Sequence, residues 1–185
     1  MIGRTATVLP LKVVGLAALA LAACSQPTTA QDVAPRPDGP VLDEADVFPA
    51  AQEAALDAEL TQYWRETGVA LVVVTDKSLD GRPIEDVAFE TFNQWGVGNA
   101  ETDRGLLVLL APNDREVRIE VGCGLNRVVT DLKAKAIIED RMLPLFKQGD
   151  VVGGTLAGVE ELKRAATGPA ITDAPLPPLC RENAG

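Results

Sequence analysis

The middle of the chain alternates between two hydrophobic patterns, which are helical stripes and continuous apolar runs. Four segments carry apolar residues at helical spacing, and we expect them to be helices: residues 56–64, 84–95, about 131–143 and about 152–164. Gly68 and Gly96 follow the first two stripes as stops, and Pro144 stops the third. Trp64 and Trp95 sit on these stripes, so both are expected in the core.

Between the stripes lie segments typical of strands. Residues 69–74 form an almost unbroken β-branched run, and residues 105–111 form a second continuous apolar run, as in strands buried on both faces. A turn at residues 112–114 leads into residues 117–121, where apolar and charged positions alternate. Strands that alternate with helices predict an α/β sandwich.

The connections predict which residues share an edge of this sheet. A helix between the first two strands makes them parallel, whereas the tight turn makes the third antiparallel to the second, so the sheet is mixed. The third strand therefore ends, at residues 122–124, beside Asp103, and the next helix opens nearby at Asp131. We expect Asp103, this glycine loop and Asp131 to cluster, with Asp76 and Asp114 at the opposite end.

The first 23 residues are typical of a secretory signal peptide. Arg4 and Lys12 are followed by a wholly small or apolar run at residues 13–23, which is too short for a comfortable membrane-spanning helix. The run ends in Leu21-Ala22-Ala23-Cys24, which resembles the bacterial lipobox. We therefore expect cleavage before Cys24 and lipidation of its thiol, the alternative being an ordinary signal peptide with a chance cysteine.

This leader implies a location and a domain organisation. A lipid on Cys24 would hold the mature protein to the cell envelope, facing the periplasm or the exterior, and Ser25 permits sorting to an outer membrane. Proline-rich composition predicts a disordered tether over residues 24–40 and a tail over residues 167–185. The folded domain is expected over residues 41–166.

Charge and composition exclude several classes of function. The chain has a net charge of −10, and removal of the leader with its two positive charges leaves −12. Such a surface repels nucleic acid, which we exclude as a partner. The sequence contains no histidine, which rules out Ser-His-Asp and Cys-His catalysis and nearly every zinc enzyme site.

Two cysteines remain once Cys24 is lipidated. Cys123 and Cys180 form an even pair in an oxidising compartment, so we predict a disulfide between them. Two unpaired thiols, or bridges to other proteins, are the alternatives.

Several short motifs, taken in order, resemble the TPM domain family. They are Val41-x-Asp43, Trp95-Gly96-Val97-Gly98, Asp103-Arg104-Gly105, Arg118-Ile119-Glu120-Val121-Gly122, Gly124-Leu125, Thr130-Asp131, Pro144-Leu145-Phe146 and Gly149-Asp150. The family includes a thylakoid-lumen protein linked to photosystem repair and many bacterial envelope proteins. The resemblance implies a three-layer α/β/α sandwich and, for some members, calcium binding and an acid phosphatase activity.

Carried onto this chain, the resemblance implies a set of site residues. Asp43, Asp103 and Asp131 would supply carboxylates to a calcium ion. The cleft around them would be lined by Arg104, Gly105, Gly122 and Gly124. The residues themselves leave alternatives open: Asp131 or Thr130 can cap a helix, Asp43 can form a turn, and Asp103 can be a solvated residue before a strand.

Two functions remain open at this stage. One is a non-catalytic module that is tethered to the membrane by its lipid, is expected to bind calcium, and helps to assemble or maintain envelope protein complexes. The other is a calcium-dependent phosphate-ester hydrolase of the acid-phosphatase type, in which a divalent ion and carboxylates act without histidine. The sequence offers no nucleophile or base that can be named, which favours the module.

Overall fold

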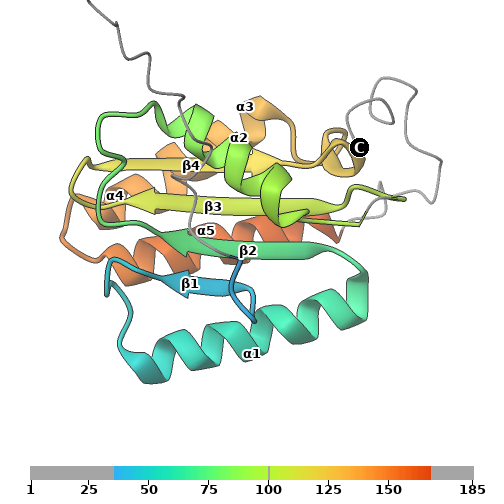
Figure 1. Ribbon diagram of the computed structural model, residues 1–185, viewed down its shortest axis with the longest axis horizontal. Helices are drawn as coiled ribbons and strands as arrows, with labels where there is room; N and C mark the ends of the chain where they lie inside the picture. Colours follow the sequence, from blue (N-terminus) through green and yellow to red (C-terminus); the bar gives the residue numbers. More distant parts are fainter. Residues whose placement is uncertain (1–35, 100, 168–185) are drawn as a thin grey trace, which may run out of the picture. The chain divides into compact units, whose positions relative to one another are not determined.

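The computed structural model describes residues 36–99 and 101–167 (Figure 1). Along the chain the elements are β1 (Val41–Asp43), α1 (Ala50–Thr67), β2 (Ala70–Thr75), α2 (Ile84–Trp95), β3 (Gly105–Ala111), β4 (Glu116–Val121), η1 (Cys123–Leu125), α3 (Asp131–Ile137), η2 (Ile138–Met142), α4 (Leu143–Phe146) and α5 (Val151–Ala166). Within the described ranges, no helix is long and apolar enough to cross a membrane.

The four strands form one mixed sheet in the order β1-β2-β3-β4. β2 is parallel to both β1 and β3, whereas β3 and β4 form an antiparallel pair. The register aligns Asp43 with Thr75 at one end of the sheet and Ala70 with Gly105 at the other. We call these the carboxyl end and the amino end, after the direction of the parallel strands. The predicted mixed sheet is confirmed.

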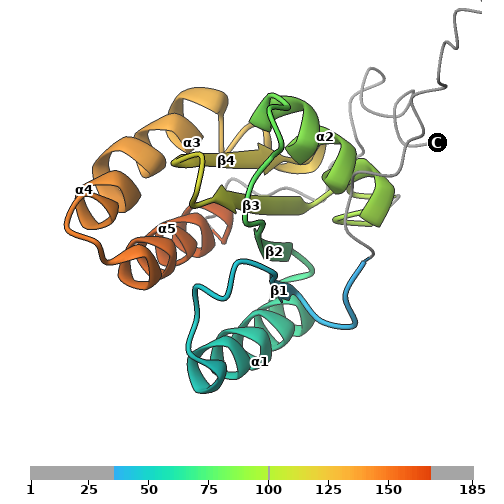
Figure 2. The same cartoon turned by 60° about the vertical axis from the view of Figure 1, so that its left-hand side comes forward.

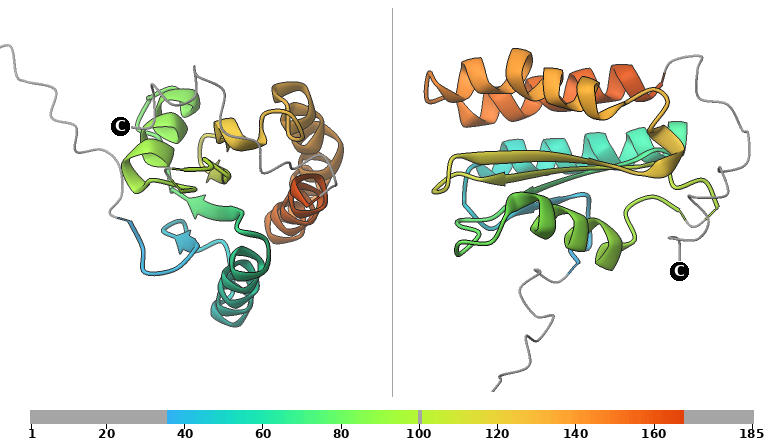
Figure 3. Two further views of the ribbon diagram at one scale, coloured as in Figure 1. Left: turned by 90° about the vertical axis from the view of Figure 1, so that its right-hand side faces the viewer. Right: turned by 90° about the horizontal axis from the view of Figure 1, so that it is seen from above.

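Helices cover both faces of the sheet, which gives three layers (Figures 2 and 3). α2 lies on one face, where Leu107 and Leu109 of β3 pack in its apolar cluster. On the other face, Leu106 and Val108 pack in a larger cluster with α1, α3 and α5. All of β3 is buried because it lies between these two clusters, which explains why its sequence is apolar at every position. The predicted α/β/α sandwich is confirmed.

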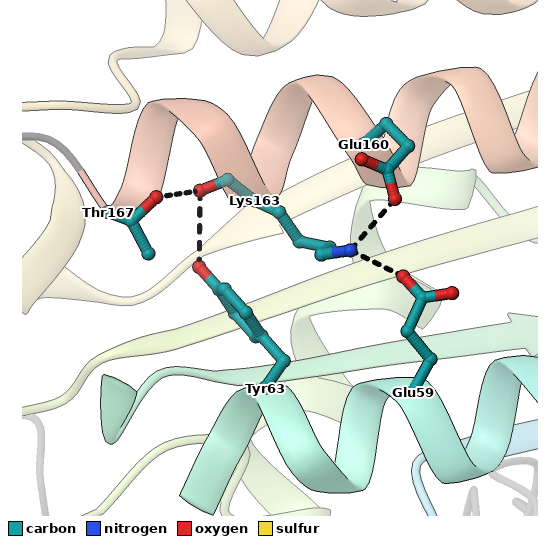
Figure 4. Close-up of polar contacts among 5 residues, drawn as sticks. All are labelled: Glu59, Tyr63, Glu160, Lys163 and Thr167. Atoms are coloured by element: carbon teal, nitrogen blue, oxygen red, sulfur yellow. Dashed lines mark hydrogen bonds and ion pairs between the residues drawn. The ribbon is translucent and has the colours of Figure 1, made fainter. Parts of the chain in front are cut away.

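α1 and α5 are joined by a polar network beside the core (Figure 4). Lys163 of α5 pairs with Glu59 of α1, and its ammonium lies 2.8 Å from the carboxylate of Glu160. The hydroxyl of Tyr63 donates to the carbonyl of Lys163 at 3.3 Å, and Thr167 donates to the same carbonyl at 2.6 Å. Burial raises the pKa of Tyr63 to about 12, so this hydroxyl keeps its proton at any physiological pH.

The structure departs from the sequence expectations at Pro144. The helical segment does not stop there but passes through the π-helical turn η2 into α4, with Pro144 in the first turn of α4. Leu143 donates to the carbonyl of Ile138, five residues back. Pro144 has no N–H to donate, and a proline is tolerated where a new helical segment begins.

Two further expectations are wrong. Trp64 was placed in the core, yet it is 55% exposed because it lies one position past the buried Tyr63 on α1. Residues 36–40 were placed in a disordered tether, yet they lie against the domain. Arg36 donates to the carbonyl of Trp95 at 2.6 Å, and the carbonyl of Pro40 accepts the N–H of Val73 at 2.9 Å. Sequence analysis also missed β1, which has only three residues.

Candidate functional site

The glycine loop after β4 returns to Asp103, as the topology predicts. The carboxylate of Asp103 accepts the N–H of Cys123 at 2.7 Å, and its carbonyl accepts the N–H of Gly124 at 3.0 Å. Asp103 adopts a φ of +45°, a left-handed conformation that Asp and Asn tolerate better than most residues. The residue thus joins the start of β3 to the η1 turn at the amino end of the sheet.

The glycines of this loop are required by close backbone approach. A Cβ on Gly122 would lie 2.4 Å from the carbonyl oxygen of Asp103, and one on Gly124 would lie 1.9 Å from that of Thr102. A Cβ on Gly105 would lie 2.2 Å from the carbonyl oxygen of Val97. These positions therefore serve the packing of one backbone segment against another.

Asp103 is half-buried at this edge. Burial raises the pKa of its carboxyl above the ordinary value, and the hydrogen bond from the Cys123 N–H partly offsets that rise. Next to it, Arg104 is also half-buried, and its carbonyl accepts the N–H of Ala70 at 2.9 Å.

Asp43 lies at the carboxyl end of the sheet, opposite Asp103. Its carboxylate accepts the N–H of Val47 at 3.0 Å, the N–H of Phe48 at 2.7 Å, and the hydroxyl of the fully buried Thr75. Of the two roles left open for Asp43, the structure shows the turn former. Its oxygens hold the connection between β1 and α1.

Asp131 is exposed in the first turn of α3, and the cap of this helix is the neighbouring Thr130. The side chain of Thr130 accepts the N–H of Lys133 at 3.3 Å. An acidic residue in a first turn is favourable because the helix dipole places partial positive charge there. α3 follows the η1 turn, so Asp131 and Asp103 both come from segments next to the glycine loop.

The structure therefore does not bring the three predicted ligands together. Parallel pairing puts Asp43 at the end of β1, whereas Asp103 precedes β3, so the length of β2 separates them. Asp43 was expected beside the other two only from the resemblance to the TPM domain family, since the topology of the strands grouped Asp103 with Asp131 alone. Across the described residues, no group of three acidic, cysteine or histidine side chains could hold a metal ion. As three ligands of one calcium ion, these aspartates do not fit.

A cavity of about 280 Å³ lies at a different place, at the start of β2, before the first residue of β1 pairs with it. Its lining includes Trp64 of α1, residues 70–72 of β2, the segment 95–98 after α2, and residues 36–40. β1 pairs with β2 only from Val73 onward, so the backbone of residues 70–72 has no neighbouring strand on this side. We call this stretch of backbone the open edge of β2.

Sequence analysis missed this cavity, although one signal for it was present. Pro40 precedes β1 and has no N–H to donate, so strand pairing cannot extend past it by the usual ladder. A proline directly before a strand therefore indicated where pairing stops.

Cys24 and Cys180 lie outside the described residues, while Cys123 begins the η1 turn.

This mixed sheet, covered on both faces and closed at one end by a glycine loop, defines an α/β/α sandwich domain. The chain belongs to the TPM domain family, because the family model matches residues 41–165. A search of curated protein sequences found no match.

Solved bacterial structures share this fold. The N-terminal domain of a protein from P. gingivalis is 36% identical, with a TM-score of 0.63 over 68% of this chain and 80% of that one. The N-terminal domain of a Corynebacterium glutamicum protein is 20% identical (TM-score 0.55, 75% and 90% covered). The BA42 protein of Bizionia argentinensis is 24% identical (TM-score 0.56, 64% and 81% covered).

Proposed function

We propose that this TPM domain is a lipid-anchored, extracytoplasmic module that acts by binding a protein of the cell envelope. The observation that carries the proposal is the cavity at the open edge of β2, next to the exposed Trp64. Tryptophan is among the residues most enriched at the energetic centres of protein interfaces, because its large indole gains much by burial. An exposed tryptophan beside unpaired strand backbone offers both apolar area and hydrogen-bonding groups.

The chemistry of the other site residues supports a binding role. The carboxylates of Asp43 and Asp103 accept hydrogen bonds from backbone N–H groups, and these bonds hold the neighbouring loops in place. The glycines beside Asp103 are likewise used for close packing. The residues singled out from the sequence thus build a rigid scaffold, and the accessible apolar surface lies elsewhere.

A site-specific crosslink tests this proposal. A photoreactive amino acid at position 64 of the lipidated protein should crosslink one defined envelope protein in cells, identified by mass spectrometry. Phe89 is the matched control, because it is also a large exposed side chain, 60% accessible, on α2. Equal crosslinking from positions 64 and 89, or none from either, would contradict a binding surface at Trp64.

A calcium-dependent phosphate-ester hydrolase is the second candidate. The half-buried Asp103 favours it, since a carboxyl with a raised pKa can keep a proton for a leaving group. Calcium binding at this edge would need ligands other than Asp43. The binding proposal predicts only background turnover of p-nitrophenyl phosphate, with calcium or with EDTA. Turnover that requires calcium and is abolished by Asp103→Asn would establish the hydrolase instead.

A further inference from the structure

The backbone groups of Leu71 face the open edge of β2. The N–H of Val73 donates to the carbonyl of Pro40 at 2.9 Å, so Val73 faces β1, and Leu71, two positions earlier, faces the same way. In the parallel register of Val41 with Val73, the carbonyl of Leu71 lies opposite the nitrogen of Pro40, which has no hydrogen. The ladder between β1 and β2 therefore ends before Leu71.

These groups of Leu71 have no partner within the domain. In the part of the chain that the structure describes, no group pairs with its N–H or its carbonyl on this side. Leu71 is 1% exposed and lines the cavity, and buried backbone groups are nearly always paired in folded proteins. The cavity thus offers one backbone donor and one backbone acceptor, in the geometry of a strand.

We propose that the envelope protein bound at this cavity contributes an extended basic segment, which adds as a short strand to the open edge of β2. One residue of that segment exchanges two hydrogen bonds with Leu71, as opposite residues do in an antiparallel ladder. This inference rests on the proposed binding function and specifies the kind of segment that the partner supplies.

The walls of the cavity fit the side chains of an added strand. A residue opposite Leu71 has its side chain on the same face of the sheet as Leu71. Leu71 packs in the cluster that contains Leu60 of α1, so that side chain lies on the α1 face, where Trp64 lines the cavity. The two flanking side chains lie on the other face, where Val97 lines the cavity. Both faces are apolar, so a short apolar run fits best.

Charge favours a basic segment around this apolar run. The charged residues in the lining, Arg36 and Asp38, are of opposite sign, and Arg36 already donates to the carbonyl of Trp95. The acidic residues of α1, which forms one wall, outnumber its one basic residue: Glu53, Asp57, Glu59 and Glu66 against Arg65. The whole chain has a net charge of −10. Lys or Arg beside the apolar run is therefore attracted, whereas an acidic segment is repelled.

A substitution that closes the edge tests strand addition. Pro40→Val supplies an N–H opposite the Leu71 carbonyl, so β1 gains a bond that the partner then loses. The photoreactive amino acid at position 64 is placed in the full lipidated chain, with and without this substitution. We expect Pro40→Val to lower the yield of the crosslink to the envelope protein roughly fivefold, the factor that corresponds to one hydrogen bond. Pro37→Val is the matched control, because it changes a proline of the same segment that does not face Leu71, and it should leave the yield unchanged.

Two further measurements check the mechanism. In the Pro40→Val protein, the new amide at position 40 should be protected from hydrogen exchange, because it donates to the Leu71 carbonyl. Mass spectrometry of the crosslinked product should identify a partner segment that contains a short apolar run next to Lys or Arg.

The outcomes separate this inference from the proposed function. Equal crosslink yields with and without Pro40→Val would overturn strand addition while leaving the binding proposal in place. A freely exchanging amide at position 40 would also overturn it, as would a crosslink to a helical or acidic segment or to a second copy of this chain. The absence of any crosslink from position 64 in the unsubstituted chain would instead contradict the proposed function, and strand addition with it.

Discussion

Individual aspartates in this protein act through the backbone groups that they bind. Asp43 accepts two N–H groups and a hydroxyl, Asp103 accepts one N–H, and Asp150 caps α5 by accepting the N–H of Gly153. A carboxylate bonded in this way is stabilised by donors that cannot move. The acidic residues thus determine how the connections between elements are shaped.

Asp103 offers a prediction at this scale. Asp103→Asn keeps an oxygen acceptor for the Cys123 N–H, tolerates the left-handed φ and removes a half-buried charge. We expect its melting temperature at pH 7 to equal or exceed that of the wild type. Asp103→Ala loses the hydrogen bond and adopts the left-handed φ less well. Its free energy of unfolding should therefore be about 2 kcal/mol lower than that of the Asn variant. Equal stability of the two variants in urea unfolding would contradict this role.

The pH dependence of stability checks the same residue. The folded protein holds the proton of Asp103 more tightly than the unfolded chain does, because burial raises the pKa. The contribution of this carboxyl to stability is therefore greatest at low pH. It falls as the pH rises from about 4, the ordinary carboxyl value, through the raised pKa of the folded state. Asp103→Asn should lose this part of the wild-type pH profile, measured as the free energy of unfolding against pH.

At the scale of elements, the connection between β1 and α1 depends on one side chain. β1 has three residues and pairs on one side only, so its own ladder contributes little. The carboxylate of Asp43 holds the following turn through Val47 and Phe48, and it joins β1 to β2 through Thr75. The edge of the sheet at its carboxyl end is therefore stabilised mainly by this residue.

Asp43→Ala should consequently lower the free energy of unfolding by about 2–4 kcal/mol, because it leaves several donors unpaired. The loss should be the same in EDTA and in millimolar calcium, since the carboxylate oxygens are used by the protein itself. Glu44→Ala is the matched control, because Glu44 is the exposed neighbour, and it should change stability by less than about 0.5 kcal/mol. A loss seen only in calcium would instead indicate a ligand role.

At the scale of the whole molecule, we predict that the mature protein begins at Cys24 and is held to a membrane by lipid. Labelled palmitate should be incorporated into the wild type and not into Cys24→Ser, which should be released from the membrane fraction. Several acyl chains bind firmly because each buried methylene contributes about 0.8 kcal/mol. A wild-type protein found soluble in the periplasm, without lipid, would contradict the anchor.

The predicted Cys123–Cys180 disulfide also belongs to this scale. Cys123 begins the η1 turn at the amino end of the sheet, and α1 and α5 end near that same edge. A bridge would close a loop of about 57 residues and remove on the order of 4 kcal/mol of unfolded-chain entropy. Mass spectrometry of a non-reduced digest should show one joined peptide, and two separate free-thiol peptides would exclude the bridge.

Local patterns were sufficient to predict most elements. The apolar run at 105–111 and the helix at 84–95 match β3 and α2 residue for residue, because burial on both faces and a single helical stripe each leave a distinct periodicity. The ends of α1 and α2 could also be predicted from the sequence. A glycine follows each helix, and both glycines adopt the positive φ that commonly ends a helix. Topological rules then placed the glycine loop beside Asp103.

Only the tertiary structure decided where Asp43 lies relative to Asp103 and where the cavity beside Trp64 forms. β1 is too short to leave a periodicity, so the sequence could not show that Asp43 lies at the opposite end from Asp103. The cavity beside Trp64 lies where β2 has no partner strand, and the point at which β1 begins to pair is a long-range property of the sheet. Periodicity reports which side of an element is buried, whereas a site depends on contacts between elements distant in sequence, and those are determined by packing.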